Sequence, residues 1–472
     1  MKQKKTKIVA TIGPASNSKR TIEELVDAGV DVFRFNFSHS DHETHEEVFD
    51  RVREVSDDIA LMLDTKGPEV RLREVEESTE LQGGETVEIT SEKVIGNSRK
   101  LSINHVGIEN RLEEGDRILI DDGKVALKVK AIGENIECLV QNGGEIGSRK
   151  SVNVPGKDVG LSAPTEKDLK DLKFGAEKGF DFVALSFVKE ASDVEEVRQF
   201  LEEHDADIDI ISKIEHLKAV ENYSEILEAS DGVMVARGDL GVEARPARVP
   251  LLQKEQIREA NRASKPVITA TQMLESMTEN PMATRAEASD VANAVIDGTD
   301  AVMLSGESAV GDYPVKAVEF MKNIVKEVEK SNGDDIHHTV KQRSKTVTDV
   351  ISKSVWQSSK DLDTDLIVAH TSSGSTAKNI ARYRPNQSII AFTDKKEVKR
   401  KLNLVWGVKP IYIEFSGSVD DLIYRSAKTL YDRGIVEEDN QIVLSSGVPT
   451  AVPGATNMME IRNVEDILEH KS

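Results

Sequence analysis

The stretch IDIISKIEHLKAVENYSEILEASDGVMVARGDLG, residues 208–241, alternates between two kinds of residue pattern. The apolar, β-branched runs Ile208–Ile214 and Gly232–Ala236 predict strands, and Ala219–Ala229 between them predicts an amphipathic helix. Two neighbouring strands joined through a helix run parallel, because the crossover brings the chain back to the same edge of the sheet. The stretch therefore predicts one unit of an α/β fold.

The same alternation recurs along the first two thirds of the chain. The strands that it predicts are Lys7–Ile12, Val32–Phe37, Ile59–Asp64, Phe182–Phe187, Ile208–Ile214, Gly232–Ala236, Pro266–Ala270 and Ala301–Leu304. The helices between them include Lys19–Ala28, Ala191–Glu203, Lys254–Ser264, Arg285–Asp297 and Pro314–Glu329. Eight such units close into a (β/α)8 TIM barrel, whose active sites lie at the C-terminal ends of the strands.

The alternation is interrupted once, after Thr65, by a segment rich in short strands and glycine turns. Its predicted strands are Thr86–Ile89, Arg117–Ile120, Val125–Ile132 and Ile136–Val140. We expect a small β-barrel domain inserted in a loop of the larger barrel. Because it emerges from the rim that carries the site, it is placed to act as a lid.

A further α/β domain follows the polar stretch Asn332–Arg343, which we interpret as a linker. Its predicted strands are Leu366–His370, Ser388–Phe392, Lys409–Ile413, Gln441–Leu444 and Asn457–Ile461. The expected domain limits are thus 1–68 and 159–335 for the barrel, 69–158 for the inserted domain and 336–472 for the C-terminal domain.

Composition limits the partners and the compartment. The formal net charge of −22 argues against nucleic acid or an anionic membrane as the main partner. No apolar run approaches the roughly 18 residues of a membrane span, and the lone Cys138 allows no internal disulfide, so we expect a cytoplasmic protein. An anionic substrate would need local positive charge.

The sequence lacks the common phosphate-binding motifs, and its one histidine cluster is a weak candidate for a metal site. The chain has neither a Walker A loop nor a dinucleotide fingerprint after a strand. His39, His42 and His45 could imitate a metal cluster, but their spacing spreads them over a helix surface, and we interpret them as a solvated helix start.

Charged residues instead gather at the predicted strand ends. The set combines three cations with three carboxylates: Arg34, Arg71 and Lys213 with Asp64, Glu215 and Asp239. Phosphoryl transfer needs cations around the transferring oxygens and carboxylates for the bridging metal. Residues 213 and 215 are two apart on a strand and point the same way, although a surface ion pair is the alternative. Small residues around Gly238 would let backbone N–H groups bind an anionic carboxylate.

Several stretches resemble one family, pyruvate kinase, and they follow its order along the chain. They are RFNFSH at 34–39, LDTKGPEVR at 63–71, ISKIE at 211–215, MVARGDLGVE at 234–243, TATQMLESM at 269–277, MLSGES at 303–308 and GDYP at 311–314. The resemblance implies a cytoplasmic glycolytic enzyme that transfers a phosphoryl group from phosphoenolpyruvate to ADP, giving pyruvate and ATP. It also implies a homotetramer.

The resemblance implies a role for each matching residue. Glu215 and Asp239 would hold the divalent cation, Mg²⁺ or Mn²⁺. The oxygen atoms of four residues would hold K⁺: Asn36, Ser38, Asp64 and Thr65. A glutamate at the position of Glu69 accompanies K⁺ dependence in the family.

The same resemblance implies the catalytic and substrate-binding groups. The catalytic residues would be Lys213, Arg34 and Thr271, and the substrate would also contact Gly238 and Asp239. Arg34 and Arg71 would bind the nucleotide phosphates. Lys189-Glu190 departs from the family, which usually has basic residues there, and the acid puts one phosphate contact in doubt.

A second site is implied in the C-terminal domain. The loop Thr371–Thr376 (Thr371, Ser372, Ser373, Gly374, Ser375, Thr376) resembles the family's effector loop, and its hydroxyl and amide groups suit a phosphorylated allosteric effector. The loop expected to face it, Gly447–Gly454, contains no Arg, Lys or Trp. Two other functions stay open: a metal-dependent barrel lyase or aldolase acting on pyruvate or its enol, and a catalytically silent metabolite sensor.

Overall fold

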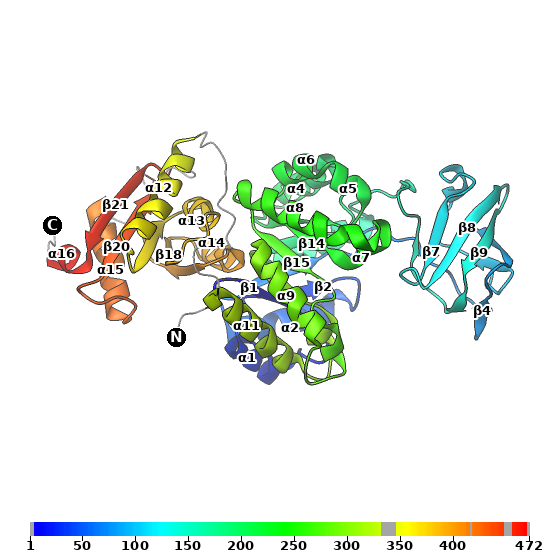
Figure 1. Ribbon diagram of the computed structural model, residues 1–472, viewed down its shortest axis with the longest axis horizontal. Coiled ribbons are helices and arrows are strands. Elements are labelled where there is room, and N and C mark those ends of the chain that lie inside the picture. The colour runs from blue at the N-terminus through cyan, green and yellow to red at the C-terminus, as the bar shows by residue number, and fades with distance from the viewer. Residues whose placement is uncertain (1–3, 332–345, 416–417, 448–455, 470–472) are drawn as a thin grey trace.

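The structure is a computed structural model that describes residues 4–331, 346–415, 418–447 and 456–469. The chain forms three bodies in a row, with the barrel between the inserted domain and the C-terminal domain (Figure 1). Among the described residues, no helix has the length and apolar character needed to cross a membrane. The expected linker Asn332–Arg343, the domain limit at residue 335 and most of the loop Gly447–Gly454 lie outside the described residues.

The barrel is closed by eight parallel strands. They are β1 Lys7–Ile12, β2 Val32–Asn36, β3 Ala60–Asp64, β12 Phe182–Leu185, β13 Asp209–Ile214, β14 Gly232–Ala236, β15 Val267–Ala270 and β16 Ala301–Leu304. Their order around the barrel is β1-β16-β15-β14-β13-β12-β3-β2, with parallel pairing throughout. The predicted TIM barrel is confirmed.

Helices surround the strands, as expected for units whose strands are buried on both faces. They are α1 Lys19–Ala28, α2 His42–Val55, α3 Glu166–Lys178, α4 Ala191–Glu203, α5 Leu217–Glu221, α6 Tyr223–Ala229, α7 Arg237–Glu243, α8 Val249–Arg262, α9 Arg285–Asp297, α10 Gly306–Ala309 and α11 Pro314–Ser331. The side chains inside the barrel include Met62, Phe182, Ile211 and Met234, all 1% exposed or less.

The single predicted helix Ala219–Ala229 is wrong, because the chain forms two short helices instead. The break falls at Asn222, whose side-chain amide donates to the carbonyl oxygen of Lys189 at 2.9 Å. This tertiary hydrogen bond favours a bend that the apolar pattern alone does not reveal.

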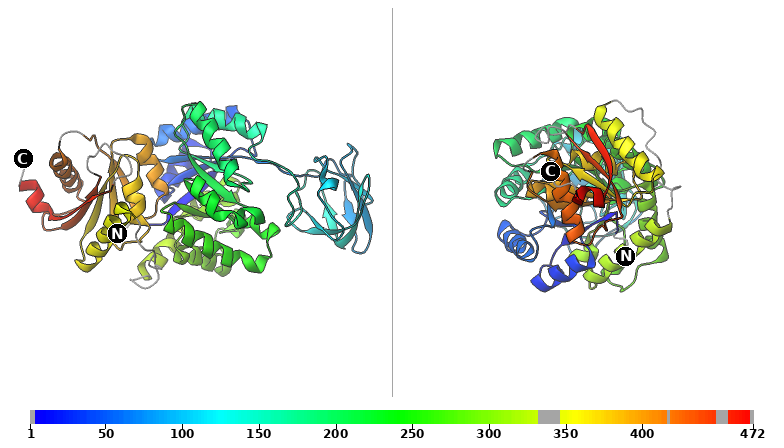
Figure 2. Two further views of the ribbon diagram at one scale, coloured as in Figure 1. Left: turned by 90° about the horizontal axis from the view of Figure 1, so that it is seen from above. Right: turned by 90° about the vertical axis from the view of Figure 1, so that its left-hand side faces the viewer.

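The inserted domain lies beyond the C-terminal ends of the barrel strands and is joined to the barrel by two connecting segments (Figure 2). It contains a six-stranded sheet, in the order β11-β7-β8-β9-β5-β6, and the pair β10-β4. The strands are β4 Thr79–Leu81, β5 Thr86–Thr90, β6 Lys100–Ser102, β7 Arg117–Ile120, β8 Val125–Ile132, β9 Ile136–Asn142, β10 Gly144–Ile146 and β11 Val152–Asn153. Its own apolar core includes the free Cys138.

The C-terminal domain is a five-stranded sheet between helices. The strands, in the order β19-β18-β17-β20-β21, are parallel except for β21. Its elements are α12 Val347–Asp361, β17 Leu366–His370, α13 Ser375–Ala381, β18 Ser388–Thr393, α14 Lys396–Lys401, β19 Val408–Tyr412, α15 Val419–Asp432, β20 Gln441–Ser446, β21 Met458–Asn463 and α16 Val464–Glu469. This confirms the predicted α/β domain.

Candidate active site

Lys213 lies at the centre of a buried charge cluster at the C-terminal ends of the barrel strands. Its Nζ is 2.8 Å from Glu215 Oε1, 3.2 Å from Asp64 Oδ1 and 2.7 Å from Ser186 Oγ. Burial opposes its charge, but the charges of Asp64 and Glu215 outweigh this and raise the pKa of Lys213. The ammonium is therefore held in its charged form.

Arg34 completes the cluster from the middle of β2. Its Nε donates to Asp64 Oδ2 at 2.5 Å, and its Nη1 donates to Thr11 Oγ1 at 2.9 Å. Burial alone would raise the pKa of Asp64, but Arg34 and Lys213 outweigh it and hold that pKa below its ordinary value. Two cations thus share one buried carboxylate.

Glu215 is 1% exposed and keeps a fixed orientation. Besides Lys213, its carboxylate accepts a hydrogen bond from the backbone N–H of Phe187 at 2.7 Å. Phe187 has a φ of 58°, an unusual value for a residue with a bulky side chain, and this conformation turns its N–H toward the glutamate. Glu215 is therefore positioned both by the side chain of Lys213 and by the backbone N–H of Phe187.

Asp239 lies in the first turn of α7, close enough to Glu215 and Lys213 for their charges to act on it. Burial raises the pKa of Asp239 to about 7, and the Glu215 carboxylate adds to this while Lys213 opposes it. Two carboxylates that repel each other in a buried site suit a divalent cation between them. Among the described residues, no group of three His, Cys, Asp or Glu side chains forms a metal site by itself.

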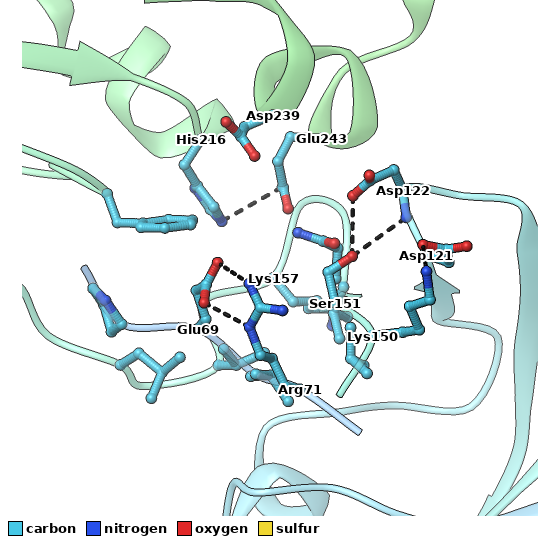
Figure 3. A pocket seen from close by; sticks show the side chains of 18 of the residues that line it. Glu69, Arg71, Asp121, Asp122, Lys150, Ser151, Lys157, His216, Asp239 and Glu243 are labelled. Atoms are coloured by element: carbon cyan, nitrogen blue, oxygen red, sulfur yellow. Dashed lines mark hydrogen bonds and ion pairs between the residues drawn. The ribbon is translucent and has the colours of Figure 1, made fainter. Parts of the chain in front are cut away.

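A pocket of about 290 Å³ opens between this rim and the inserted domain. Figure 3 shows Asp239 and Glu243 on the barrel side and Glu69, Arg71 and Lys150 on the opposite side. Glu69 binds Arg71 through both carboxylate oxygens, at 2.7 and 2.9 Å. Glu69, which is expected to mark K⁺ dependence, and Arg71, which is expected to bind the nucleotide, therefore form one ion pair. This pair faces Asp239 across the pocket (Figure 3).

The four residues expected to hold K⁺ lie at the ends of the neighbouring strands β2 and β3 and in the loops that follow them. The N–H of Phe37, between Asn36 and Ser38, donates to the backbone carbonyl oxygen of Asp64 at 3.0 Å, which joins the ends of β2 and β3. Asn36 Oδ1 accepts from the Ser38 N–H at 3.1 Å. The structure thus brings the two segments together, and Asp64 contacts both Arg34 and Lys213.

Thr271 and Gly238 meet at the ends of β15 and β14. The Gly238 N–H donates to Thr271 Oγ1 at 2.8 Å, and Thr271 has a φ of 67°. Thr271 therefore sits in a strained backbone conformation beside the first turn of α7.

Lys189 and Glu190 do not project together toward the pocket. Lys189 lines it, but its Nζ binds Asp158 at 2.7 Å and the carbonyl oxygen of Leu161 at 2.9 Å. Glu190 instead pairs with Lys218. Burial would raise the pKa of Asp158, but the hydrogen bonds from Lys189 and from the Gly160 N–H lower it to about 2. Lys189 is thus paired with Asp158, in the segment that leads back from the inserted domain, and Glu190 is paired with Lys218 on α5 of the barrel.

The three histidines do not converge. His42 pairs with Asp171 at 2.7 Å, whereas His45 is buried against Phe37 and its Nε2 lies 2.9 Å from the carbonyl oxygen of His39. The expectation of a solvated helix start is wrong for His45, because its ring packs on the aromatic core under α2.

The loop expected to bind an effector follows β17 directly. Thr371 and Thr376 are both 5% exposed, and Gly374 has a φ of 82° immediately before α13. Thr376 Oγ1 lies 2.8 Å from Thr456 Oγ1. The loop is therefore held by its threonines, with Ser373 facing outward.

Sequence reasoning missed two residues of the site. Ser186 contacts Lys213, and Glu243 lines the pocket, where burial raises its pKa to about 7. The only signal for Ser186 was its position near the end of the predicted fourth strand, Phe182–Phe187. Glu243 is the last residue of the motif MVARGDLGVE, about two helical turns beyond the end of β14 at Ala236.

A closed (β/α)8 barrel with clustered cations and carboxylates beneath an inserted domain defines a class of barrel enzymes that act on anionic substrates. The family model of the pyruvate kinase barrel domain matches residues 3–318, and that of the pyruvate kinase alpha/beta domain matches residues 349–462. The chain therefore belongs to the pyruvate kinase family.

Individual relatives agree. A pyruvate kinase of Staphylococcus aureus strain USA300 is 46% identical over 475 residues, which cover 98% of this chain and 81% of the relative. The pyruvate kinase of the bovine strain RF122 has the same identity and coverage. The crystal structure of a pyruvate kinase from Cryptosporidium parvum superposes with a TM-score of 0.93 at 38% identity, covering 98% of this chain and 96% of that chain.

Proposed function

We propose that this chain carries out the reaction of its family, the transfer of the phosphoryl group of phosphoenolpyruvate to ADP, which yields pyruvate and ATP in glycolysis. The observation that carries the proposal is the buried cluster of Lys213, Arg34, Asp64 and Glu215 beside the pocket. Phosphoryl transfer depends on positioning and on electrostatic stabilisation, and such a cluster supplies both. No observation favours a lyase, an aldolase or a silent sensor.

The carboxylates suit the divalent cation that this chemistry uses. Glu215 and Asp239 would hold Mg²⁺ or Mn²⁺, because both offer hard oxygen donors and their mutual repulsion is relieved by a cation. Mg²⁺ commonly takes the rest of its ligands from water and substrate oxygens, so two protein carboxylates are sufficient. When bound, the ion supplies charge neutralisation at the phosphoryl and enolate oxygens.

The remaining groups receive the following roles in this proposal. Lys213 stabilises the transferring phosphoryl group and the developing enolate. Arg34 and Arg71 bind phosphate oxygens. The backbone N–H of Asp239, at the start of α7, binds the substrate carboxylate. The Gly238 N–H joins it by leaving Thr271 Oγ1, to which it donates in the absence of substrate, and Thr271 lies beside them where the enolate is protonated.

A monovalent cation adds charge beside the phosphate. Asn36, Ser38, Asp64 and Thr65 all offer oxygen donors, and the hydrogen bond between the Phe37 N–H and the Asp64 carbonyl oxygen keeps their two loops adjacent. Because Glu69 is present, we expect K⁺ dependence.

A coupled assay tests the proposal directly. Purified protein is mixed with phosphoenolpyruvate, ADP, Mg²⁺ and K⁺, and pyruvate is followed through a lactate dehydrogenase reaction. We expect turnover that requires both substrates, and a rate no higher than the enzyme-free background would reject the proposal. Replacing K⁺ by tetramethylammonium in the same assay should lower the rate strongly.

Regulation and assembly belong to the same proposal. The serine- and threonine-rich loop Thr371–Thr376 offers hydroxyl and amide donors for a phosphorylated effector. We expect a cytoplasmic homotetramer, in keeping with the family. Repeating the assay with a panel of sugar phosphates and nucleotides tests the effector, and light scattering coupled to gel filtration tests the assembly.

A further inference from the structure

Ser186 follows β12 directly and has no role in the scheme above. It is 1% exposed, and its hydroxyl oxygen contacts three groups of the site. Oγ lies 2.7 Å from Lys213 Nζ, 2.7 Å from the backbone carbonyl oxygen of Thr65 and 3.3 Å from Asp64 Oδ1. The serine thus lies between the lysine and two residues of the expected K⁺ site.

The hydrogen atoms available on each group decide which group donates in these contacts. An ammonium group only donates, so Lys213 donates to Ser186 Oγ. The hydroxyl carries one hydrogen, and the shorter contact assigns it to the Thr65 carbonyl oxygen rather than to Asp64. The chain of donors therefore runs from Lys213 through Ser186 to Thr65.

The backbone fixes this arrangement. The Ser186 N–H donates to Thr65 Oγ1 at 3.0 Å, and the Thr65 N–H donates to the carbonyl oxygen of Ala184 at 3.0 Å. Ser186 therefore donates two hydrogen bonds to Thr65 across the ends of β12 and β3, one from its N–H and one from its hydroxyl. The hydrogen bonds between the ends of β12 and β3 therefore fix the Ser186 backbone, and this places its hydroxyl beside Thr65.

We propose that Ser186 is a positioning residue that couples the monovalent-cation site at Asp64 and Thr65 to Lys213. The inference rests on the proposed function of that site. The hydroxyl orients the Thr65 carbonyl oxygen and at the same time places the lysine ammonium, so the two positions are set together.

The divalent-cation side of the site is held differently. Glu215 accepts from the backbone N–H of Phe187 at 2.7 Å, and this bond does not involve the Ser186 side chain. Glu215 also pairs with Lys213, but its bond to the Phe187 N–H remains when the hydroxyl is lost. Loss of the hydroxyl should therefore disturb the K⁺ site and Lys213 more than the Mg²⁺ site. A general loss of structure would affect both.

The test is the Ser186→Ala variant of the full chain. We expect its apparent activation constant for K⁺ to rise about tenfold, in keeping with the loss of one buried hydrogen bond, and kcat to fall. The activation constant for Mg²⁺ should stay within about twofold. As a readout independent of activity, the rise in melting temperature on replacing tetramethylammonium by K⁺ should be smaller in the variant than in the wild type.

Ser212→Ala is the matched control. Ser212 is fully buried next to Lys213 in sequence, but its Oγ pairs with Ser230 Oγ at 2.6 Å, away from the charge cluster. It should lose stability without changing the K⁺ constant. Ser186→Cys, which keeps the size but bonds weakly, should give an intermediate K⁺ constant and serves if the alanine variant does not fold.

The outcomes separate the two proposals. If the wild type needs no K⁺, the proposed monovalent site fails and the coupling fails with it. If the wild type needs K⁺ but Ser186→Ala leaves its constant unchanged, or shifts the Mg²⁺ constant equally, the coupling alone is overturned.

Discussion

The ammonium group of Lys213 stays charged although it is buried. The side chain is 12% exposed, yet two carboxylates and one hydroxyl surround its ammonium group. Buried charges are tolerated only when they are paired and hydrogen-bonded. The same pairing leaves a positive charge preorganised for the phosphoryl group, so stability and catalysis depend on the same contacts.

Lys213→Met should therefore remove a charge that acts mainly in the transition state. We expect kcat to fall about a thousandfold, with little change in substrate affinity. The coupled assay measures both. Lys265→Met is the control, because the Lys265 ammonium binds the backbone carbonyl oxygens of Leu227 and Ser230, which are not part of the charge cluster. A Lys213 variant that keeps most of its kcat would show that the role belongs to another residue.

The expected link between Glu69 and K⁺ dependence can be tested by reversing the charge of this residue. A lysine at this position would place a fixed ammonium near the phosphate and partly replace K⁺. We expect Glu69→Lys to reduce the ratio of activity with K⁺ to activity with tetramethylammonium by about tenfold. Glu74→Lys, which breaks the exposed pair with Arg149 in the same domain, should leave the ratio unchanged. An unaltered ratio in Glu69→Lys would refute the assignment.

At the scale of elements, α3 connects the inserted domain to the site. Thr165 and Asp168 form a capping box at its start, and Asp168 Oδ1 also accepts from the Gly67 N–H at 3.0 Å. Lys167 Nζ donates to the carbonyl oxygen of Phe37 at 2.8 Å. The first turn of this helix therefore holds the loops after both β2 and β3.

Asp168→Ala should weaken this connection. Asp168 is fully buried, and its loss leaves the N–H groups of Thr165 and Gly67 without their acceptor. We expect a loss of about 2–3 kcal/mol in unfolding free energy, measured by urea titration of the circular dichroism signal. Asp421→Ala removes the equivalent capping-box residue at the exposed start of α15 and should cost less, because water can replace the lost acceptor there. Equal losses in the two variants would contradict the added role of Gly67.

A buried histidine makes the C-terminal domain sensitive to acid. His370, the last residue of β17, is 2% exposed and its Nε2 lies 2.8 Å from Ser426 Oγ. Burial lowers the pKa of His370 to about 4. Since the unfolded chain takes up the proton at a pH of about 6.5, stability is lost as the pH falls from about 6.5 to 4.

The expected loss between pH 7 and pH 5 is about 2 kcal/mol from this group. Urea unfolding followed by tryptophan fluorescence measures it, because both tryptophans, Trp356 and Trp406, lie in the C-terminal third of the chain. His370→Gln cannot titrate and should show a correspondingly smaller pH dependence. An identical pH dependence in the two proteins would rule out His370 as the source.

At the scale of the whole molecule, buried ion pairs join the barrel to the C-terminal domain at the face opposite the site. Arg384 binds Asp300 at 3.0 Å, and each side chain is 5% exposed. Asp300 also accepts from the backbone N–H of Trp406 at 3.1 Å. The two bodies therefore share a charged interface, whereas two connecting segments join the inserted domain to the barrel (Figure 2).

Breaking this pair should destabilise the contact strongly. Arg384→Met leaves the Asp300 carboxylate buried without its cation, which costs about 3–5 kcal/mol. We expect the tryptophan fluorescence transition to shift to lower urea. Adding Asp300→Asn to the same protein should recover part of the loss, because it removes the uncompensated charge. A double variant less stable than Arg384→Met would contradict this account.

Much of the fold could be predicted because its signals are local. The strands β1, β14 and β16 begin and end where the apolar runs predict, since strands buried on both faces contain few polar residues. The break at Asn222 could not be predicted, because it depends on the carbonyl oxygen of Lys189, 33 residues away.

The barrel, its insertion, the α/β domain and the charged residues at the strand ends could all be inferred from the sequence alone, because periodicity and residue type are properties of short segments. Which of those charges meet depends on how the strands are arranged in space. Asp64 and Lys213 are 149 residues apart in the chain, and the closure of the barrel places them in contact, with Ser186 between Lys213 and Thr65.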